Sequence, residues 1–569
     1  MRLATTWYDK HRSALRAARE ACRTRGHFSL FAETPDRHPA GVEGAAVGRA
    51  AFESLLGRRF EIDQPGTIGY TSGEISPYTG APLGIEYPLA EIDVLFNAAR
   101  RSMPAWAAAG ARARLGVCME VIDRLHARVF ESAQAVMHTA GQSALMSYAG
   151  SGTNALDRGV EALAYAAAAM EDVPSTALWE RRFGSANIAL RKKYTLVPRG
   201  VAVCFTCATF PTWNAYPAML ANLATGNPVI VKPHPSGILP MAIAVRVFRE
   251  CLSEAGFSPD LVTLCPDTPM QPLGKILVKH RHTAIVDFTG SATFGAWVEG
   301  NAAPALCYTE TSGVNTVVID SVDELEPVVR SLATTMSLFS AQMCTSPQNI
   351  YIPADGIRCG AKKIGRDEFS SALVDAMRAI ASDPKRAAPI LAAIQSPATL
   401  ALVEQMRAQG AKAGRVLLEP GSYQHPDFPQ ARTCTPLLLE VPCGRNALYG
   451  QERFGPIGFL IPTEAGDAAL IEAAQDARQG GAITAFAYST DDAWVSRAEE
   501  AFSAAGAQLT VNLTGPMPLN FAAAYSDYHV TGLNPAGNAT LTDAAFVTSR
   551  FRITQSRRFD AKSMQRPNN

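Results

Sequence analysis

Short runs of residues that are apolar at every position recur along the chain, separated by stretches in which apolar residues return about every 3.6 positions. Fully apolar runs are typical of strands in parallel sheets whose two faces are both covered by helices. In the first half of the chain 201–205 and 229–231 are apolar at every position, and 261–264 and 284–288 are apolar except at Thr263 and Asp287. Because helical stretches fall between them, the pattern predicts a sheet built from β-α-β units.

The same alternation starts afresh between about 305 and 520. Its predicted strands are 316–320, 349–352, 437–441, 459–461 and 509–512. A chain of 569 residues is too long for one ordinary core, since domains usually hold about 100 to 200 residues. We therefore expect an α/β fold with two open parallel-sheet domains.

Two other stretches, 186–197 and 551–555, alternate apolar and polar residues and contain charges, as exposed strands do. We expect them to form a protruding ribbon, paired with each other or with another subunit. The predicted division is a helical extension at 1–60, a first sheet domain at 61–185 and 199–305, a ribbon at 186–198 and 545–569, and a second sheet domain at 306–544.

Composition and charge narrow the possible partners. Lys and Arg together number 52, as do Asp and Glu, so the chain offers no net positive field to nucleic acid. The chain contains no run of 18 uncharged apolar residues, so no membrane span is predicted. The N-terminus is charged by Asp9 and lacks the apolar core of a signal peptide. We expect a cytoplasmic protein whose partners include neither nucleic acid nor a membrane.

The eleven cysteines are scattered, as suits a reducing compartment. One close pair, Cys204 and Cys207, has no second Cys or His pair to complete a zinc site, so it indicates core packing and no metal is predicted. Cys344 differs, because it stands between small and polar residues just before a predicted strand. It is either a nucleophile or, like most free cysteines, a small buried hydrophobe.

A cysteine that adds to a carbonyl and then passes an acyl group to water needs an oxyanion donor, a base for the water and an acceptor for the leaving hydride. Glu310 is a candidate base, and the alternative is a solvated loop carboxylate. The turn at 289–295, between a strand and a helix, could present backbone N–H groups to a phosphate or be an ordinary βα turn.

Taken together, these motifs resemble the aldehyde dehydrogenase superfamily. Thr309-Glu310-x-x-Gly313 and Gln342-x-Cys344-Thr345 are similar to its two active-site signatures, with base and nucleophile 34 residues apart. Phe288-Thr289-Gly290-Ser291, Val229 to Pro233 and Glu452 to Pro456 resemble its cofactor segments. The resemblance implies the family's fold, with a cofactor-binding first domain, a catalytic second domain and an oligomerisation ribbon.

The resemblance also implies roles for single residues. Cys344 would form a thiohemiacetal and then a thioester with the aldehyde, and Glu310 would activate water for hydrolysis to the acid. The implied cofactor contacts are Lys232, Pro235, Gly290, Ser291, Gly295, Glu452 and Phe454. A homodimer or homotetramer is expected.

Two positions depart from the family pattern. Counting back from Lys232 places Thr209 where the family has its oxyanion asparagine, and a threonine hydroxyl donates one hydrogen bond over a shorter reach. Asn214 offers an amide nearby, or else caps a helix start. Pro235 stands where the family often has a glutamate that binds the adenosine ribose. Without that carboxylate, Lys232 is predicted to favour NADP, with NAD possible.

Within the superfamily, the segments 532–547 and 154–165 and the N-terminal extension resemble the PaaN-type proteins of phenylacetate catabolism. This resemblance implies a CoA-linked semialdehyde from aromatic ring cleavage as the substrate. Two alternatives stay open: a CoA-acylating dehydrogenase, against which Glu310 argues because a thiol acceptor needs no water-activating base, and a binding protein that keeps the fold with little activity.

Overall fold

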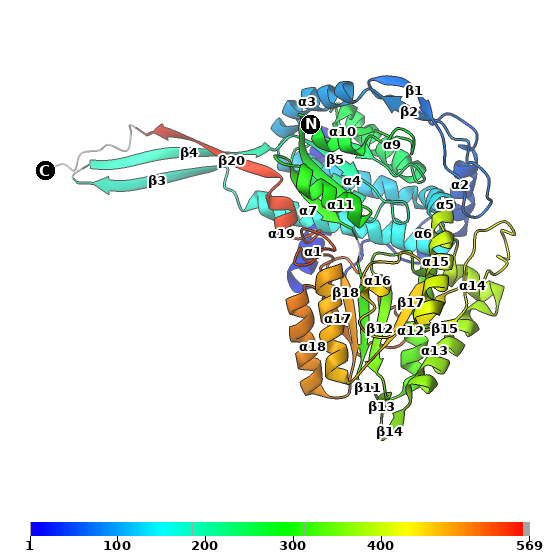
Figure 1. The fold of residues 1–569 in the computed structure, drawn as a ribbon. Helices are drawn as coiled ribbons and strands as arrows, with labels where there is room; N and C mark the ends of the chain where they lie inside the picture. The colour runs from blue at the N-terminus through cyan, green and yellow to red at the C-terminus, as the bar shows by residue number, and fades with distance from the viewer. Residues whose placement is uncertain (1, 185, 312, 561–569) are drawn as a thin grey trace.

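The computed structural model describes residues 2–184, 186–311 and 313–560. Two α/β units lie one above the other in Figure 1, and a narrow ribbon projects from one side. Each unit contains one main sheet of largely parallel strands. The predicted fold of two open parallel sheets with a protruding ribbon is confirmed.

The sheet of the first unit has the strand order β7-β6-β5-β8-β9, with all neighbours parallel. Alternate residues of β5 pack into two different cores: Ala202 and Cys204 into one, Val203 and Phe205 into the other. Burial on both faces explains why this strand is apolar at every position. The strands are β5 (Val201–Phe205), β6 (Val229–Lys232), β7 (Val262–Leu264), β8 (Thr283–Thr289) and β9 (Leu306–Glu310).

Strand β9 was missed by the sequence analysis, which assigned residues from 306 onward to the second domain. In the structure β9 pairs in parallel with β8 and forms the edge of the first sheet. Its sequence, Leu-Cys-Tyr-Thr-Glu, ends in two polar residues, Thr309 and Glu310, which are buried and hydrogen-bonded to other parts of the chain. Glu310 is the last residue of this strand.

The sheet of the second unit has the order β15-β16-β17-β12-β10-β18-β19, in which only the edge pair β15 and β16 is antiparallel among the described strands. Its two faces again pack into separate cores. The strands are β10 (Asn315–Ile319), β12 (Pro347–Pro353), β15 (Arg415–Leu418), β16 (Leu437–Glu440), β17 (Ile457–Thr463), β18 (Thr484–Tyr488) and β19 (Gln508–Val511).

Helices surround both sheets (Figure 1). Those of the first unit are α2 (Gly41–Glu53), α3 (Ile92–Ala108), α4 (Ala111–Ala127), α5 (Val129–Ala140), α6 (Ala144–Tyr148), α7 (Ala155–Glu171), α8 (Ala215–Ala224), α9 (Leu239–Glu254), α10 (Gly274–Lys279) and α11 (Ala292–Asn301). Those of the second unit are α12 (Leu325–Ser337), α13 (Arg366–Ala381), α14 (Pro384–Leu391), α15 (Pro397–Ala413), α16 (Asn446–Tyr449), α17 (Gly466–Gly480) and α18 (Asp492–Ala505).

Two small sheets complete the units. Strands β1 (Thr67–Thr71) and β2 (Tyr87–Ala90) form an antiparallel pair around a turn-rich segment, and the other small sheet contains β11 (Ser321–Val322), β13 (Ile357–Cys359) and β14 (Lys362–Ile364). In the part of the chain that the structure describes, no helix combines the length and the apolar character needed to cross a bilayer.

The ribbon has three antiparallel strands: β3 (Thr176–Phe183), β4 (Ala186–Pro198) and β20 (Phe551–Phe559). The predicted stretches at 186–197 and 551–555 pair with each other. Strand β3 is an addition to the prediction, which had left residues up to 185 in the first sheet domain. Because it is rich in charged residues, its sequence resembles that of a loop, yet the strand pairs along its whole length with β4. The predicted end of the ribbon at 561–569 lies outside the described residues.

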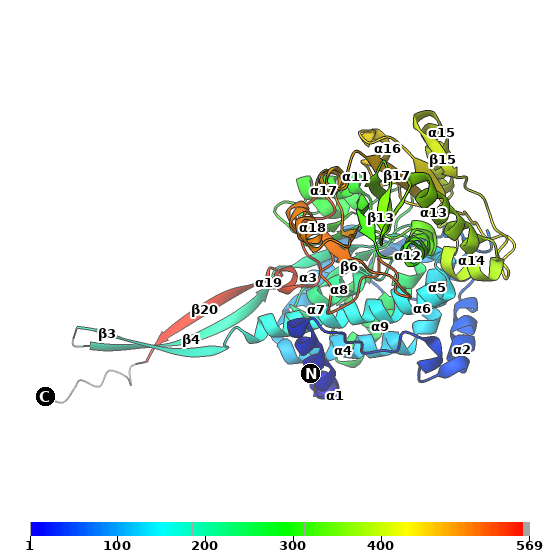
Figure 2. The same ribbon diagram turned by 90° about the horizontal axis from the view of Figure 1, so that it is seen from below.

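Helix α1 (Arg2–Thr24) shares a core with the first unit, burying Trp7 and Leu15 beside residues of α4 and α7. Figure 2, seen from below, shows α1 beside these helices. A Cβ added at Gly116 of α4 would lie 2.1 Å from the carbonyl oxygen of Ala4, so a residue without a side chain is needed for this approach. The N-terminal extension is therefore packed onto the first unit.

After β19 the chain returns to the first unit through the connecting segment 512–543, which is followed by α19 (Ala544–Thr548). Asn534 and Asn538 hold this segment. Asn534 Nδ2 donates to three carbonyls at 482, 505 and 506, and Asn538 Oδ1 accepts from Thr309 N at 2.9 Å. A bridge between Glu310 and Gly537 joins it to the end of β9. The segment thus lies fixed against the strand that carries Glu310.

Candidate active site

A cavity of about 1150 Å³ lies where the two units meet. It is lined by residues from the carboxyl ends of β5, β6, β8 and β9 of the first unit, by the segment before β12 of the second and by the connecting segment. Ligands of open α/β sheets bind at such strand ends. The cavity brings together Cys344, Glu310, Asn214 and Thr209, which the sequence analysis selected.

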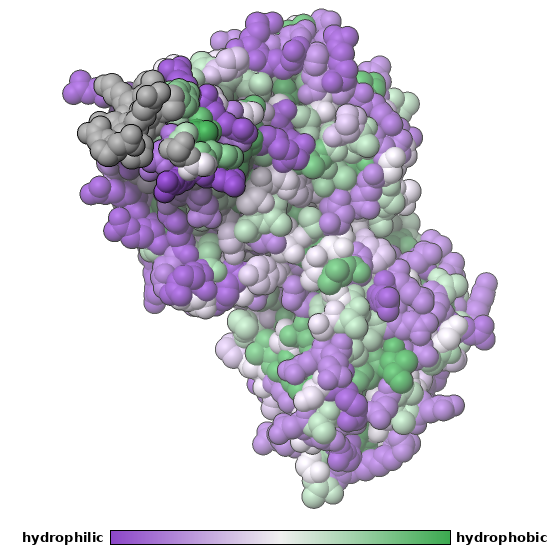
Figure 3. Space-filling model, turned by 90° about the vertical axis from the view of Figure 1, so that its left-hand side faces the viewer, coloured by the Kyte–Doolittle hydropathy of each residue, from purple (hydrophilic) through white to green (hydrophobic). Residues whose placement is uncertain are grey.

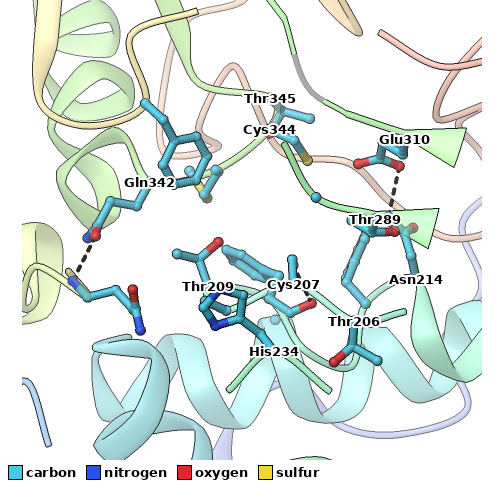
Figure 4. Close-up of a pocket in the computed structure, with 18 of the residues that line it drawn as sticks. Thr206, Cys207, Thr209, Asn214, His234, Thr289, Glu310, Gln342, Cys344 and Thr345 are labelled. Carbon is cyan, nitrogen blue, oxygen red and sulfur yellow. Dashed lines mark hydrogen bonds between the residues drawn. The ribbon is translucent and has the colours of Figure 1, made fainter. Parts of the chain in front are cut away.

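Cys344 lies three residues after the end of a backbone kink. Phe339, Ser340 and Ala341 have φ near +50°, a left-handed conformation that costs free energy in residues other than glycine. The side chain of Asn315 holds the next turn by donating to the carbonyls of Cys344 at 2.8 Å and Ser346 at 2.9 Å. Figure 4 shows the Cys344 sulfur pointing into the cavity, on the side where Glu310 and Asn214 lie.

Glu310 is buried at the end of β9 and hydrogen-bonded through both oxygens. Asn214 Nδ2 donates to its Oε2 at 2.8 Å, and His529 Nε2 lies 3.0 Å from its Oε1. Burial alone would raise the pKa of this carboxyl, but the charge and hydrogen bond of His529, with the contacts to Cys344 and Asn214, hold the pKa below its ordinary value. The carboxylate is therefore ionised at neutral pH.

Asn214 lies at the start of α8. The sequence analysis left two roles open for it, a helix cap or an active-site amide. Its side chain does not cap the helix; it donates to Glu310 and, at 3.2 Å, to Thr289 Oγ1. Thr209 also lines the cavity, and its carbonyl accepts from Gln142 Nε2 at 2.7 Å. In Figure 4 Thr209 lies beside His234, away from Glu310.

The cofactor candidates divide into two groups. Lys232, Gly290, Ser291, Glu452 and Phe454 line the cavity, whereas Pro235 and Gly295 do not. Gly295 is nevertheless required by close packing, since a Cβ there would lie 2.2 Å from the Thr311 methyl group. The Ser291 hydroxyl accepts from Phe294 N and so caps α11 rather than standing free.

A dinucleotide fits this end of the cavity. Parallel strands β6, β5 and β8 end at it, a glycine turn leads from β8 into α11, and a cation, Lys232, lies at the end of β6. Lys232 Nζ is 2.6 Å from Asp267 Oδ1, and both side chains are buried. The carboxylate of Asp267 was not anticipated, because it follows a different strand, β7, and no spacing connects it with Lys232.

His529 is the other residue that the sequence analysis missed. Its Nε2 atom lies 3.8 Å from Cys344 Sγ as well as 3.0 Å from Glu310. Donor atoms of Glu310, Cys344 and His529 all lie within 4.8 Å of one another. A single histidine in the irregular segment 512–543 has no periodicity or motif around it, so only the folded chain reveals this contact.

Comparison with known proteins agrees with the geometry. The sequence profile of the aldehyde dehydrogenase family matches residues 72–521. The chain is similar to a crystal structure of an NAD-dependent aldehyde dehydrogenase from Burkholderia multivorans, with 44% identity, a TM-score of 0.95, and 98% of this chain and 99% of that chain covered. A 1-pyrroline-5-carboxylate dehydrogenase from Thermus with bound NAD shares the fold at 15% identity and a TM-score of 0.74, over 94% and 99% of the two chains.

Curated relatives match over shorter segments. An aldehyde dehydrogenase-like protein of Gibberella fujikuroi is 27% identical over 288 residues, 49% of this chain and 56% of the relative. A 1-pyrroline-5-carboxylate dehydrogenase of Bacillus licheniformis is 30% identical over 169 residues, 27% of this chain and 31% of the relative. The matches to these two relatives thus span about half of their length or less. Because the family profile covers most of this chain, the chain belongs to the aldehyde dehydrogenase family.

Proposed function

We propose that the protein oxidises an aldehyde to a carboxylic acid with NAD(P), using Cys344 as nucleophile and Glu310 as the base for hydrolysis. The observation that carries this proposal is the convergence of both residues, from different units, in one cavity with an amide at Asn214. Bound NAD(P) supplies the hydride acceptor, and Lys232, Gly290, Ser291, Glu452 and Phe454 are the residues proposed to hold it.

The chain's own groups account for the other steps. The Cys344 thiolate adds to the aldehyde carbon, and the oxyanion is stabilised by the Cys344 backbone N–H and a side-chain donor, with each good donor contributing about 3 to 4 kcal/mol. We propose Asn214 rather than Thr209 as that donor: one N–H of its amide stays on Glu310, and the other, which donates to Thr289 Oγ1 at 3.2 Å, turns to the oxyanion. Glu310 then removes a proton from water, which attacks the thioester and releases Cys344.

For the cofactor we propose NAD over NADP. The expectation of NADP depended on an uncompensated Lys232, but Asp267 lies 2.6 Å from that ammonium group. A 2′-phosphate would meet the Asp267 carboxylate, whereas ribose hydroxyls can donate to it. The NAD dependence stated for the Burkholderia multivorans relative supports the same choice.

For the substrate we propose a CoA-linked semialdehyde derived from phenylacetate ring cleavage. The resemblance of 532–547 to PaaN-type proteins supports it, and part of the cavity lining is apolar and aromatic, as an extended acyl chain requires. Apolar side chains of this lining are Leu145, Met146, Phe210, Trp213 and Phe521.

The test is a comparison of substrates by the absorbance of reduced nicotinamide. We expect kcat/KM for the CoA-linked semialdehyde to exceed that for the free aldehyde of the same chain by at least about tenfold, without any need for added CoA. Equal values would contradict the CoA-linked substrate, and a requirement for free CoA would favour the acylating alternative. Absence of any turnover with either cofactor would favour a binding protein.

We also propose a cytoplasmic homodimer or homotetramer formed through the ribbon. All eleven cysteines are free thiols, as in a reducing compartment. Leu178, Phe183, Ile553 and Phe559 of the ribbon are about half exposed, and Figure 3, which looks along the ribbon, shows hydrophobic side chains among hydrophilic ones near its end. Light scattering should show dissociation of L178E/I553E, while the control Ile471→Glu, exposed on α17, stays assembled.

A further inference from the structure

We propose that Arg25 of the N-terminal extension is a positioning residue for the active site. Its guanidinium group holds Tyr528, and the adjacent residue His529 thereby stays bonded to Glu310. The inference rests on the proposed role of Glu310 as the base for hydrolysis. Arg25 and Tyr528 both lie outside residues 72–521, which match the family profile. Their contact is therefore an addition to the machinery that the profile describes.

Arg25 follows helix α1 in a backbone conformation that is costly for a residue with a side chain. Its φ is +55°, in the left-handed region where helix ends usually have glycine. Its N–H donates to the carbonyl of Ala21 at 2.8 Å and so closes the last turn of the helix. Strain of this kind persists where surrounding contacts hold the residue, and it is common at functional sites. The contacts of the Arg25 side chain account for it here.

The guanidinium group of Arg25 joins three parts of the molecule. Nη1 donates to the hydroxyl of Tyr165 on α7 at 2.7 Å, and Nη2 donates to the carbonyl of Asp527 at 3.3 Å. Its carbon Cζ lies 3.8 Å from the centroid of the Tyr528 ring, within the range of a cation–π interaction. The side chain of Arg25 is only 21% exposed. The extension is thus fastened to α7 and to the connecting segment by one side chain.

Two neighbouring contacts support this arrangement. Arg25 Nη1 and Arg158 Nη1 lie 3.6 and 3.3 Å from the two oxygens of the buried Glu161 carboxyl group on α7. Three residues after Arg25, the ring of Phe28 makes an edge contact with Tyr525, with ring centroids 5.1 Å apart. Residues 25–28 of the extension therefore run along residues 525–528 of the connecting segment, and α7 lies behind them.

Tyr528 connects Arg25 to the reacting groups through the next residue in the chain. His529 Nε2 lies 3.0 Å from Glu310 Oε1, and the His529 side chain is 3% exposed. Because adjacent residues share a rigid peptide unit, a shift of Tyr528 moves His529 and weakens its hydrogen bond to Glu310. Glu310 acts after the thioester has formed, so we expect loss of Arg25 to slow hydrolysis more than the transfer of hydride.

The experiment compares Arg25→Ala with the matched control Arg23→Ala, whose side chain is 72% exposed and pairs with Glu20 of the same helix. Rapid mixing with hexanal and NAD measures the first turnover and the steady state by the absorbance of reduced nicotinamide. In Arg25→Ala the steady-state rate should fall by about fivefold or more, while the first turnover stays within about twofold of the wild type. Arg23→Ala should match the wild type in both phases.

Variants of Tyr528 separate this contact from general packing. Tyr528→Phe keeps the ring face and should match the wild type, whereas Tyr528→Ala should reproduce the effect of Arg25→Ala. The double variant should be no slower than either single one by more than about twofold, because both remove the same interaction. Arg25→Lys, which keeps a cation but loses the fork of N–H donors, should show a smaller effect of the same kind and serves if Arg25→Ala fails to fold.

Hydrogen exchange gives a measurement that needs no substrate. Backbone amides of 525–531 should exchange faster in Arg25→Ala and at the wild-type rate in Arg23→Ala. If the wild type oxidises no aldehyde, the proposed function fails, and exchange alone then decides whether Arg25 holds this segment.

Three results would overturn the proposal. One is unchanged exchange at 525–531 in Arg25→Ala. Another is a first turnover and a steady state that decline together, in proportion to the folded protein. The third is a double variant whose loss equals the product of the losses in Arg25→Ala and Tyr528→Ala, since independent residues would give that result.

Discussion

Two buried pairs of a basic and an acidic side chain lie in the same cavity. At the cofactor end, Lys232 Nζ is 2.6 Å from Asp267, and at the sulfur end, His529 Nε2 is 3.0 Å from Glu310. The first pair lies at the ends of the neighbouring parallel strands β6 and β7, whereas the second joins the end of β9 to the connecting segment beside Cys344. The comparison teaches that similar pairs serve different purposes: the first suits recognition of the cofactor, and the second suits the chemistry at the sulfur.

The largest effect should come from removing the Cys344 sulfur, which lies beside the His529–Glu310 pair. Cys344→Ala should reduce formation of reduced nicotinamide by about 10⁴-fold or more, since no other group can form the thioester. Cys443→Ser, a half-buried cysteine outside the cavity, should keep wild-type activity. Loss of less than about tenfold in Cys344→Ala would place the chemistry elsewhere.

Glu310→Gln should separate the two halves of the reaction. Steady-state turnover should fall by about 10² to 10⁴-fold, the usual range for loss of a general base, while the first turnover still produces a burst of reduced nicotinamide. Rapid-mixing absorbance measures both phases. If the burst and the steady-state rate decline together, Glu310 acts before hydrolysis and its assignment as the base for hydrolysis is wrong.

Asp267→Asn should change cofactor recognition at the Lys232–Asp267 pair without affecting the Cys344 thiol. Removing the carboxylate exposes Lys232 to a 2′-phosphate, so the Kd for NADP should tighten by about tenfold, or about 1.4 kcal/mol, relative to that for NAD. Titration of intrinsic fluorescence measures both Kd values in the absence of turnover. The rate of Cys344 alkylation by iodoacetamide is the control and should stay as in the wild type. If binding of NAD and NADP weakened equally, Asp267 would not determine cofactor specificity.

The smallest effect concerns stability. The pKa of Glu310 is lower in the folded protein than its ordinary value, so this carboxylate stabilises the fold above the unfolded pKa, and the contribution is lost as pH falls through the folded pKa. The difference in Tm between the wild type and Glu310→Gln should therefore shrink as pH falls below about 4.3. It should amount to only a few degrees at pH 7. A difference that grows on acidification would contradict the assigned direction.

Much of the fold could be predicted from the sequence because buried parallel strands carry a strong local signal. The runs at 201–205 and 229–231 lie at β5 and β6 as expected. Strands β3 and β9 were missed for different reasons: β3 is exposed and tolerates charged residues that resemble those of loops, whereas β9 ends in the buried polar residues Thr309 and Glu310, whose partners are distant in sequence.

The site divides in the same way. Cys344 and Glu310 stand in motifs with a fixed spacing, so they could be found from the sequence. His529 and Asp267 contribute single side chains whose neighbours are distant in sequence, 219 residues away for the bond between His529 and Glu310. The contact of His529 arises from the return of the connecting segment to β9, and that of Asp267 from the parallel pairing of β6 with β7, so no local pattern encodes them.

The most direct measurement is mass analysis of the covalent intermediate. Glu310→Gln, mixed with aldehyde and NAD and quenched with acid within the burst, should carry the acyl group of the substrate on the peptide that contains Cys344. Cys344→Ala should carry none. Production of reduced nicotinamide by Glu310→Gln without an acyl adduct at Cys344 would contradict the assignment of nucleophile and base.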